Sequence, residues 1–427
     1  MNVHDRTHYE RLENGVDVFL LRTHVRDIVV CNMAFPGGDH ATYDTQTIAD
    51  LLETILPTGT STHKRITVRE ALDTLGVSLT FQVTHTHLVV TLASRTAVFA
   101  DALTLVVDIL TNPRVTSREF QEAVAQLCTA YEHAREDTRM QASIALVRSL
   151  YAPGHPHWAP LPSELRDEVT KVHMQEVLNF HRATFSGVGA VVCVAGDLHE
   201  KHMTSLLRDV YARLPLLRSA SAPVHPDRIV LVSKKDEIIS MREKMNVDTL
   251  LAIPLSVARD HADYHALLIG VSILGGSCSS RLFTSLRTKQ SLTYGAYASL
   301  AGMTDGYAGY LLANAIFPND VFRKGRGALR EEVARWAEKG VTSSELLRRK
   351  EELVGNHKVG LSTTRGIAGA MFAAVLSGRG IEYVDNFPSV VEALTLREVN
   401  TAIKSHVRYD LAVTAAAGSV DSDGAPL

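Results

Sequence analysis

The chain has 427 residues, of which 45% are hydrophobic and 21% are charged. It is therefore long enough for more than one domain and apolar enough to bury a sizeable core. Its 44 lysines and arginines nearly balance 47 acidic residues, for a net charge of −3, which argues against a nucleic-acid partner. No apolar run reaches the ~18 residues of a membrane-spanning helix, so we expect no membrane contact. Met1–Gly15 is polar and lacks the apolar region of a signal peptide.

The cysteines are too widely spaced for a CxxC zinc or redox motif or for a disulfide framework. They are Cys31, Cys128, Cys193 and Cys278. Together with the missing signal peptide, this spacing predicts a reduced protein in the cytoplasm.

The first half combines runs typical of strands with amphipathic helices. Apolar residues at i, i+3, i+4 and i+7 predict a helix that ends at Pro57-Thr58-Gly59. The expected elements are the strands Val16–Arg22 and Asp27–Phe35, the helices Thr45–Leu56 and Thr67–Leu75, the strand His87–Ala93, the helices Ala97–Leu110 and Ser117–Arg135, and the strand Ala190–Ala195.

The second half has a similar order of elements, after a stretch rich in Ser, Pro and Ala that predicts a linker. The tail Val420–Leu427 has the composition of a disordered segment. The expected elements are the strand Val247–Pro254, the helices Asp260–Leu274 and Ser279–Lys289, the strands Leu292–Ala301 and Tyr307–Ala315, the helices Asp320–Lys339 and Ser343–His357, and the strand Leu411–Ala417.

Two segments indicate that the halves are copies of one another. Arg114–Phe120 and Gly340–Leu346 are similar, and each opens a long amphipathic helix with a Ser/Thr cap and an early Glu, as in a capping box. We predict one domain at residues 1–214, a linker at 215–227 and a second domain at 228–427. Strands grouped with helices, without strict alternation, indicate the α+β class for each half.

The segment Ala49–Thr60 resembles the zinc helix of the M16 (pitrilysin/insulinase) metallopeptidase family. The family motif there is HxxEH, in which two histidines one helical turn apart bind zinc and the glutamate polarises the zinc-bound water. In this chain the two histidine positions hold Asp50 and Thr54, and only the glutamate remains, as Glu53.

The rest of the zinc site departs from the family in the same way. The resemblance places the third ligand, a glutamate in the family, at Tyr131, and a neutral phenol does not replace a carboxylate. The family's Asn-Ala on the substrate-binding strand appears as Thr80-Phe81. We therefore expect no metal or other cofactor in this chain and no peptide hydrolysis by the chain alone.

The second half retains a motif that the first half does not have. Leu274–Tyr294 resembles the family's C-terminal signature of Gly-Gly, Ser-Ser-Arg-Leu, and an Arg and Tyr seven residues apart. The resemblance implies that Arg287 and Tyr294 bind the substrate backbone and the developing oxyanion, since both side chains donate hydrogen bonds to negative oxygen.

The resemblance covers roughly residues 10–418 and implies two homologous LuxS/metallohydrolase-like α/β sandwich domains. The length agrees with the short two-domain members of the family, which pair as dimers. In some pairs one subunit carries HxxEH and its zinc, and the other carries the Arg/Tyr pair. The resemblance therefore implies a heterodimer with an HxxEH-containing homologue, in which Arg287 and Tyr294 act in trans on peptide substrates.

Two other functions stay open on the residues alone. The first is that of a scaffold or peptide-binding protein of the same fold. The second is that of a self-sufficient hydrolase with a rebuilt site. Glu53 is either a functional residue or a relic on a solvent-facing side of its helix.

Several candidate residues also have structural alternatives. Arg287 and Tyr294 are either functional or structural, the arginine pairing with a carboxylate and the tyrosine packing in a sheet. Arg281 fits a structural role at a helix start. Four histidines and one cysteine have no further metal ligand nearby in the sequence, and we expect them to be ordinary surface residues. They are His85, His87, His155, His157 and Cys278.

Overall fold

The computed structural model describes residues 2–36, 46–155, 157–215, 236–303 and 307–427. Within them the chain forms two compact units. The predicted linker, residues 215–227, lies outside the described residues except for Pro215. Unit 1 consists of Met1–Thr129, Leu165–Val224 and Asn356–Phe387, and unit 2 of Ala130–Glu164, His225–Gly355 and Pro388–Leu427.

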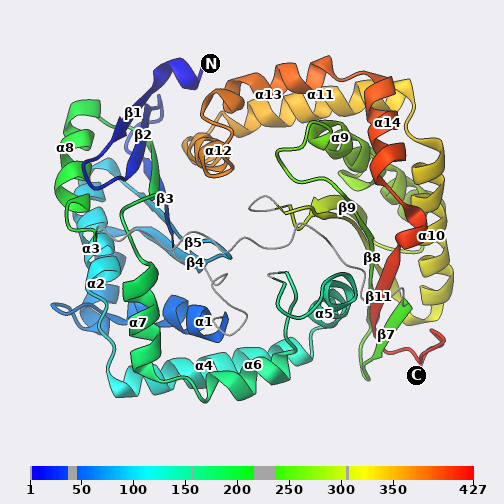
Figure 1. The fold of residues 1–427 in the computed structure, drawn as a ribbon, viewed down its shortest axis with the longest axis horizontal. Helices are drawn as coiled ribbons and strands as arrows, with labels where there is room; N and C mark the ends of the chain where they lie inside the picture. The colour runs from blue at the N-terminus through cyan, green and yellow to red at the C-terminus, as the bar shows by residue number, and fades with distance from the viewer. Residues whose placement is uncertain (1, 37–45, 156, 216–235, 304–306) are drawn as a thin grey trace. The chain divides into compact units, whose positions relative to one another are not determined.

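Unit 1 contains a six-stranded mixed sheet in the order β1-β2-β6-β3-β5-β4 (Figure 1). Only the pair β2 and β6 is parallel among the paired strands of this sheet. The central strands β3 and β6 are buried along almost their whole length, which explains their continuous apolar sequences. The strands are β1 (Thr7–Arg11), β2 (Asp17–Arg22), β3 (Val29–Pro36), β4 (Ser78–Val83), β5 (His87–Ser94) and β6 (Val191–Gly196).

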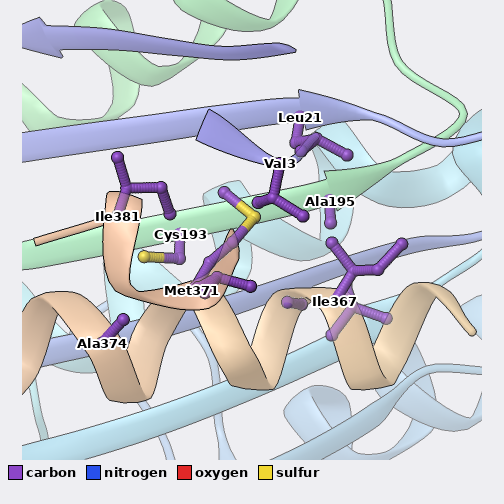
Figure 2. Packing of buried hydrophobic residues seen from close by; sticks show 11 residues of the cluster. Val3, Leu21, Cys193, Ala195, Ile367, Met371, Ala374 and Ile381 are labelled. Atoms are coloured by element: carbon purple, nitrogen blue, oxygen red, sulfur yellow. The ribbon is translucent and has the colours of Figure 1, made fainter. Parts of the chain in front are cut away.

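Helix α12 (Thr364–Leu376) covers one face of this sheet, although it comes from the second half of the sequence. Its apolar side chains recur at helical spacing and pack on strand residues that alternate toward this face (Figure 2). The buried cluster includes Ile367, Met371 and Ala374 of α12 and Leu21, Val30, Cys193 and Ala195 of the strands.

The other helices of unit 1 lie mainly away from α12. Figure 1 shows α3 and α8 on the opposite side of the sheet, where they contact each other, β5 and β2. Helix α1 packs against α7 and contacts the edge strand β4. The bounds are α1 (Gln46–Ile55), α2 (Arg65–Leu75), α3 (Phe99–Thr111), α7 (Met174–Thr184) and α8 (Glu200–Tyr211).

Unit 2 contains a five-stranded sheet in the order β7-β11-β8-β10-β9, in which only β7 and β11 are parallel. Helix α5 (Thr138–Leu150), from the first half of the sequence, packs on β8 and β11 through small and aliphatic side chains. The strands are β7 (Asp236–Ser240), β8 (Asn246–Pro254), β9 (Ala296–Ala301), β10 (Tyr310–Pro318) and β11 (Val413–Gly418).

Helices α9, α10 and α14 also belong to unit 2, where α9 contacts β9 and α14 packs along α9. Helices α4, α6, α11 and α13 each have residues in both units. The bounds are α9 (Tyr264–Gly275), α10 (Phe322–Lys339), α14 (Leu396–His406), α4 (Ser117–Arg135), α6 (Pro162–Val169), α11 (Ser343–Gly360) and α13 (Glu382–Ala393).

The two sheets have the same topology, which supports the inference of two copies. Without β1, the first sheet has the order β2-β6-β3-β5-β4, and the second has β7-β11-β8-β10-β9. In both sheets the first strand of the half is followed by its last, second, fourth and third strands. Both predicted capping boxes are present: Thr116 and Glu119 exchange hydrogen bonds at the start of α4, as do Thr342 and Glu345 at the start of α11. After each of these helices the chain contributes the next helix, α5 or α12, to the sheet of the other half.

The α+β class is confirmed, but some predicted elements differ in detail. The helix predicted at Ser279–Lys289 is largely a π-helix, η6 (Phe283–Lys289), and the following strand begins only at Ala296. The prediction of a disordered tail is wrong. Val420 is fully buried and bridges to Pro426, and the Asp421 carboxylate accepts the backbone N–H of Ala425 at 2.8 Å.

None of the described helices is by itself long and apolar enough to span a membrane. The bent pair α11 and α12 passes that test of length and composition when the two helices are taken together. In this fold the apolar side of α12 is buried on the sheet of unit 1.

Candidate functional site

The segment that resembles the zinc helix of the family, and is called the former zinc helix below, forms α1, where Asp50, Glu53 and Thr54 are all half-buried. The helix forms because Leu51, Leu52 and Ile55 make one buried stripe, which turns the motif positions away from the core. The motif positions therefore lie on a helix, as predicted, and the two positions that hold histidine in the family motif hold Asp50 and Thr54.

The side chains that remain on this helix make local contacts. Thr54 Oγ1 donates a hydrogen bond to the backbone oxygen of Asp50 at 2.8 Å. The carboxylate of Glu53 accepts the backbone N–H of Val83 at 2.9 Å, at the end of edge strand β4. Glu53 is thus neither a relic in solvent nor placed only as a base, because it ties α1 to β4.

Tyr131 lies on the part of α4 that belongs to unit 2, and only 8% of it is exposed. A largely buried phenol, with an ordinary pKa of about 10, is a poor ligand for zinc at neutral pH. The donor set of α1 lacks nitrogen ligands, and Thr54 uses its hydroxyl within the helix. The residues present do not fit a zinc ion of the HxxEH type.

A polar cavity of about 520 Å³ lies beside α1 in unit 1. Glu53 and Thr54 line it together with Phe81 of β4, the residue that replaces the family's alanine. Two arginines of α2, Arg65 and Arg69, also line the cavity. This mixture of a carboxylate, guanidinium groups and a sheet edge favours contacts with polar backbone rather than with an apolar ligand.

In unit 2, Arg287 lies on the π-helix η6, an element that is rare and is often found at functional sites. Its side chain is exposed, and the guanidinium carbon lies 4.8 Å from the centre of the Phe283 ring. No carboxylate pairs with it within the described residues. Within the part of the chain that the structure describes, the alternative of an arginine held by an acidic residue thus finds no partner.

Tyr294 follows in the loop that joins η6 to β9, and 86% of it is exposed. The loop is well fixed around it. Ser291 adopts a left-handed conformation (φ 53°) and donates its N–H to the Arg287 carbonyl at 3.0 Å. The buried hydroxyl of Thr293 lies 2.6 Å from the Ile316 carbonyl of β10. Tyr294 is thus an exposed side chain on a fixed backbone, and it does not pack in a sheet.

The Gly-Gly of the motif is explained by close packing. A Cβ atom on Gly275 would lie 2.0 Å from the backbone nitrogen of Ala298, and one on Gly276 would lie 2.8 Å from the Ser272 carbonyl. Only glycine lets the end of α9 approach β9 so closely. Gly275 thereby positions β9, the strand that follows Tyr294.

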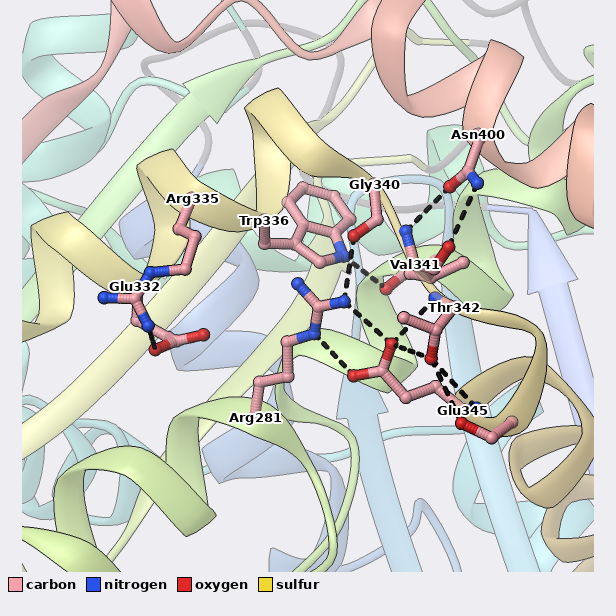
Figure 3. A network of polar contacts seen from close by, with 11 residues as sticks. Arg281, Glu332, Arg335, Trp336, Gly340, Val341, Thr342, Glu345 and Asn400 are labelled. Carbon is pink, nitrogen blue, oxygen red and sulfur yellow. Dashed lines mark hydrogen bonds and ion pairs between the residues drawn. The ribbon is translucent and has the colours of Figure 1, made fainter.

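Arg281 has a structural role, as expected. Its guanidinium forms two hydrogen bonds to the Glu345 carboxylate, at 2.6 and 2.7 Å, and a third to the Gly340 carbonyl (Figure 3). Burial raises the pKa of Glu345, but the hydrogen bonds from Arg281 and Thr342 outweigh this effect and lower the pKa to about 2. The network joins the start of η6 to the capping box of α11.

A second polar cavity, of about 410 Å³, lies against η6 and this network. Its lining has an excess of positive charge. Lys289 and Arg348 form no ion pair within the described residues, whereas the other lining cations do. The paired cations are Arg281, Arg335 and Arg349, and their partners are Glu345, Glu332 and Glu352.

Among the residues that were expected to be ordinary surface residues, His155 and His157 contact aromatic rings, whereas Cys278 is exposed. His157 contacts the Gly302 carbonyl at 3.1 Å, and both it and His155 lie against the rings of Tyr151 and Tyr307. Cys278 is exposed and free. The pair at His155 and His157 is thus part of an aromatic cluster in unit 2.

The sequence reasoning missed the residues that fix the Tyr294 loop, Ser291 and Thr293. A lone threonine or serine between two elements carries no pattern, because its role depends on which carbonyl groups the fold brings near. Gly295, next to Tyr294, was the only local signal of a tight loop.

Comparison with known proteins matches one segment of the chain to a family model. Residues 171–353 match the family model described as the peptidase M16 inactive domain. Over this segment, which is less than half of its length, the chain is similar to that part of the peptidase M16 family.

One relative and a solved structure cover nearly the whole chain, and a second relative covers about half of it. The Helicobacter pylori protein named non-peptidase homolog YmxG is 21% identical over 95% of this chain and 92% of its own length. An uncharacterized zinc protease of Streptomyces coelicolor is 28% identical over 46% of this chain and 43% of its own length. The crystal structure of a peptidase M16 inactive domain from Pseudomonas fluorescens superposes with a TM-score of 0.85 at 21% identity, covering 96% of this chain and 98% of the other. This likeness shows that the M16 two-domain fold is shared.

Proposed function

We propose that this protein is the non-zinc subunit of a heterodimeric M16 peptidase. It contributes Arg287 and Tyr294 to a peptide held at the zinc site of a partner that carries HxxEH. The partner supplies the metal and the attacking water, and this chain supplies hydrogen-bond donors to the substrate.

The observation that carries the proposal is the state of Arg287 and Tyr294. Both are exposed, and within the described residues neither forms an ion pair or a side-chain hydrogen bond. Their backbone is nevertheless fixed by Ser291 and Thr293. Donors that are held in place and still available are what stabilisation of a developing oxyanion requires.

The name of the Helicobacter relative, a non-peptidase homolog, supports the part of the proposal that this chain does not hydrolyse peptides by itself. It equally favours a second function, that of a peptide-binding or scaffold protein without any catalytic partner. The polar cavity beside α1 and the edge strand β4 favour peptide contact in either case.

The test is co-expression with an HxxEH-bearing homologue from the same genome. The purified mixture and each chain alone are assayed with zinc and a quenched-fluorescent peptide library. We expect cleavage by the mixture alone. Arg287→Ala and Tyr294→Phe should each lower kcat/KM by about 100-fold or more, because each removes a donor to the oxyanion.

The chain offers matched control variants close to both residues. Lys289→Ala removes an exposed cation from the same π-helix, and Tyr297→Phe removes a hydroxyl from a half-exposed tyrosine on β9. Both should leave kcat/KM within about twofold. If the chains associate and cleave but Arg287→Ala and Tyr294→Phe have no effect, the composite-site role is wrong. If the chains neither associate nor cleave, the scaffold function is the better account.

A further inference from the structure

Three side chains that have no role in the proposed peptidase function lie close together in unit 2. They are His261, Asp263 and His406, and one ligand atom from each lies within 4.8 Å of the other two. We propose that these residues form a binding site for one divalent transition-metal ion of the zinc class. The site shares no residue with the former zinc helix or with the Arg287 loop.

The fold brings these residues together at the junction of two packed helices. Asp263 directly precedes α9, and His261 lies in the turn before it. His406 is the last residue of α14, which packs along α9. The turn is held by two backbone N–H groups: that of Asp263 donates to His261 Nδ1 and that of Tyr264 to the His261 carbonyl, each at 3.0 Å.

The atoms already have the arrangement of a ligand set with an outer partner. His406 Nε2 lies 2.8 Å from a carboxylate oxygen of Asp263, and His406 Nδ1 lies 3.0 Å from the Ser256 hydroxyl. The rings of His261 and His406 are 5.2 Å apart and nearly perpendicular. His406 is mostly buried, with 12% of its side chain exposed, so its orientation is fixed before a metal arrives.

Metal binding needs only small changes in hydrogen bonding. When His406 Nε2 binds the ion, the ring proton moves to Nδ1, and the Ser256 hydroxyl turns to accept it, as outer-shell partners of metal-bound histidines do. His261 binds through one ring nitrogen, while the other ring nitrogen carries the proton. The ring stays neutral in both histidines.

The donor set selects the class of metal. Two imidazoles and one carboxylate suit zinc, cobalt, nickel or copper, whereas magnesium and calcium prefer oxygen ligands alone. His261 is exposed and Asp263 is half-exposed, so water fills the remaining coordination positions. A bound ion would join the turn before α9 to the end of α14.

The experiment titrates the untagged full-length chain, stripped with a chelator, first with Co²⁺ and then with Zn²⁺. We expect one Co²⁺ per chain, seen as a visible absorption band that Zn²⁺ abolishes, and a rise in unfolding temperature with either ion. His261→Ala and His406→Asn should each abolish the band. His261 is exposed, so its alanine variant is expected to fold normally, which circular dichroism checks.

Two control variants separate this site from others. His202→Ala removes an exposed histidine from α8, and Asp50→Asn changes the former zinc helix. Both should retain one bound ion. The proposal is overturned if one equivalent of Co²⁺ gives no band, if His261→Ala and His406→Asn still bind, or if Asp50→Asn alone abolishes binding. None of these results bears on the peptidase assay.

Discussion

At the residue scale, Glu53 keeps the place of a catalytic base but makes a structural contact, accepting the Val83 N–H at 2.9 Å. Glu53→Ala leaves this part-buried N–H without its acceptor, and we expect the free energy of unfolding in urea to fall by about 1 kcal/mol. Glu53→Gln keeps an acceptor oxygen and should lose less than half of that. If Glu53→Gln is stable but abolishes cleavage in the co-expressed pair, Glu53 acts as a base after all.

Glu345 gives the fold a defined response to acid. Its pKa in the folded protein is about 2, below the ordinary 4.5, because Arg281 and Thr342 donate hydrogen bonds to the carboxylate. Its charge therefore stabilises the fold fully above pH 4.5, and this contribution is lost as the pH falls from 4.5 toward 2.

The measurement is the unfolding temperature of the wild type and of Glu345→Gln between pH 2.5 and 6. The difference in unfolding temperature between the two proteins should be largest toward neutral pH and should shrink as the pH falls below 4.5. This comparison with Glu345→Gln separates the effect of Glu345 from that of other acidic groups. An equal difference at every pH would contradict the assignment. Wild-type protein at low salt is the reference, since screening weakens partly exposed pairs.

At the scale of elements, Gly275 controls how closely α9 approaches β9. Gly275→Ala would put a Cβ atom 2.0 Å from a backbone nitrogen, so the helix must shift, and we expect a loss of about 3 kcal/mol in urea denaturation. Gly355→Ala is the matched control, because a Cβ atom there meets no atom within 4 Å in helix α11. It should be neutral or stabilising by up to about 1 kcal/mol. Equal effects of the two variants would refute the packing argument.

Elements that carry their own local signals could be predicted from the sequence. Helix α4 has the predicted bounds Ser117–Arg135, because its capping box and its periodic apolar stripe lie within the segment. Helices α5 and α12 were not predicted. Thr364–Leu376 is rich in Ala and Gly and is apolar on most sides, so it shows no clear period, and its packing partners are distant in sequence.

The candidate site was likewise predictable only where its residues carry a local motif. Residue types at motif spacing identified Asp50, Glu53, Arg287 and Tyr294. The contact between Glu53 and Val83 was not predictable, because it depends on the register of β4 beside α1. The cluster of His261, Asp263 and His406 joins residues about 140 positions apart, and no spacing rule connects them.

At the scale of the whole molecule, the exchange of α5 and α12 makes each unit depend on both halves of the chain. Met371 of α12 is fully buried against the first sheet. Met371→Ala should therefore cost about 3 kcal/mol and raise amide hydrogen exchange in β2 and β6, which lie far away in sequence. Met245→Ala, at an 84% exposed position, is the control and should change neither quantity. Unchanged exchange in β2 and β6 would contradict the packing of α12.

The packing of α12 on the sheet of the other half also has a consequence for synthesis on the ribosome. Strand β6 ends at Gly196, but the helix that covers its sheet ends only at Leu376. At about 5–20 residues per second, the intervening stretch takes roughly 10–40 s to translate. During that time the apolar strand residues that α12 later covers are open to water and to other nascent chains. A chaperone that shields this face until α12 emerges would have a defined binding surface and a defined moment of release.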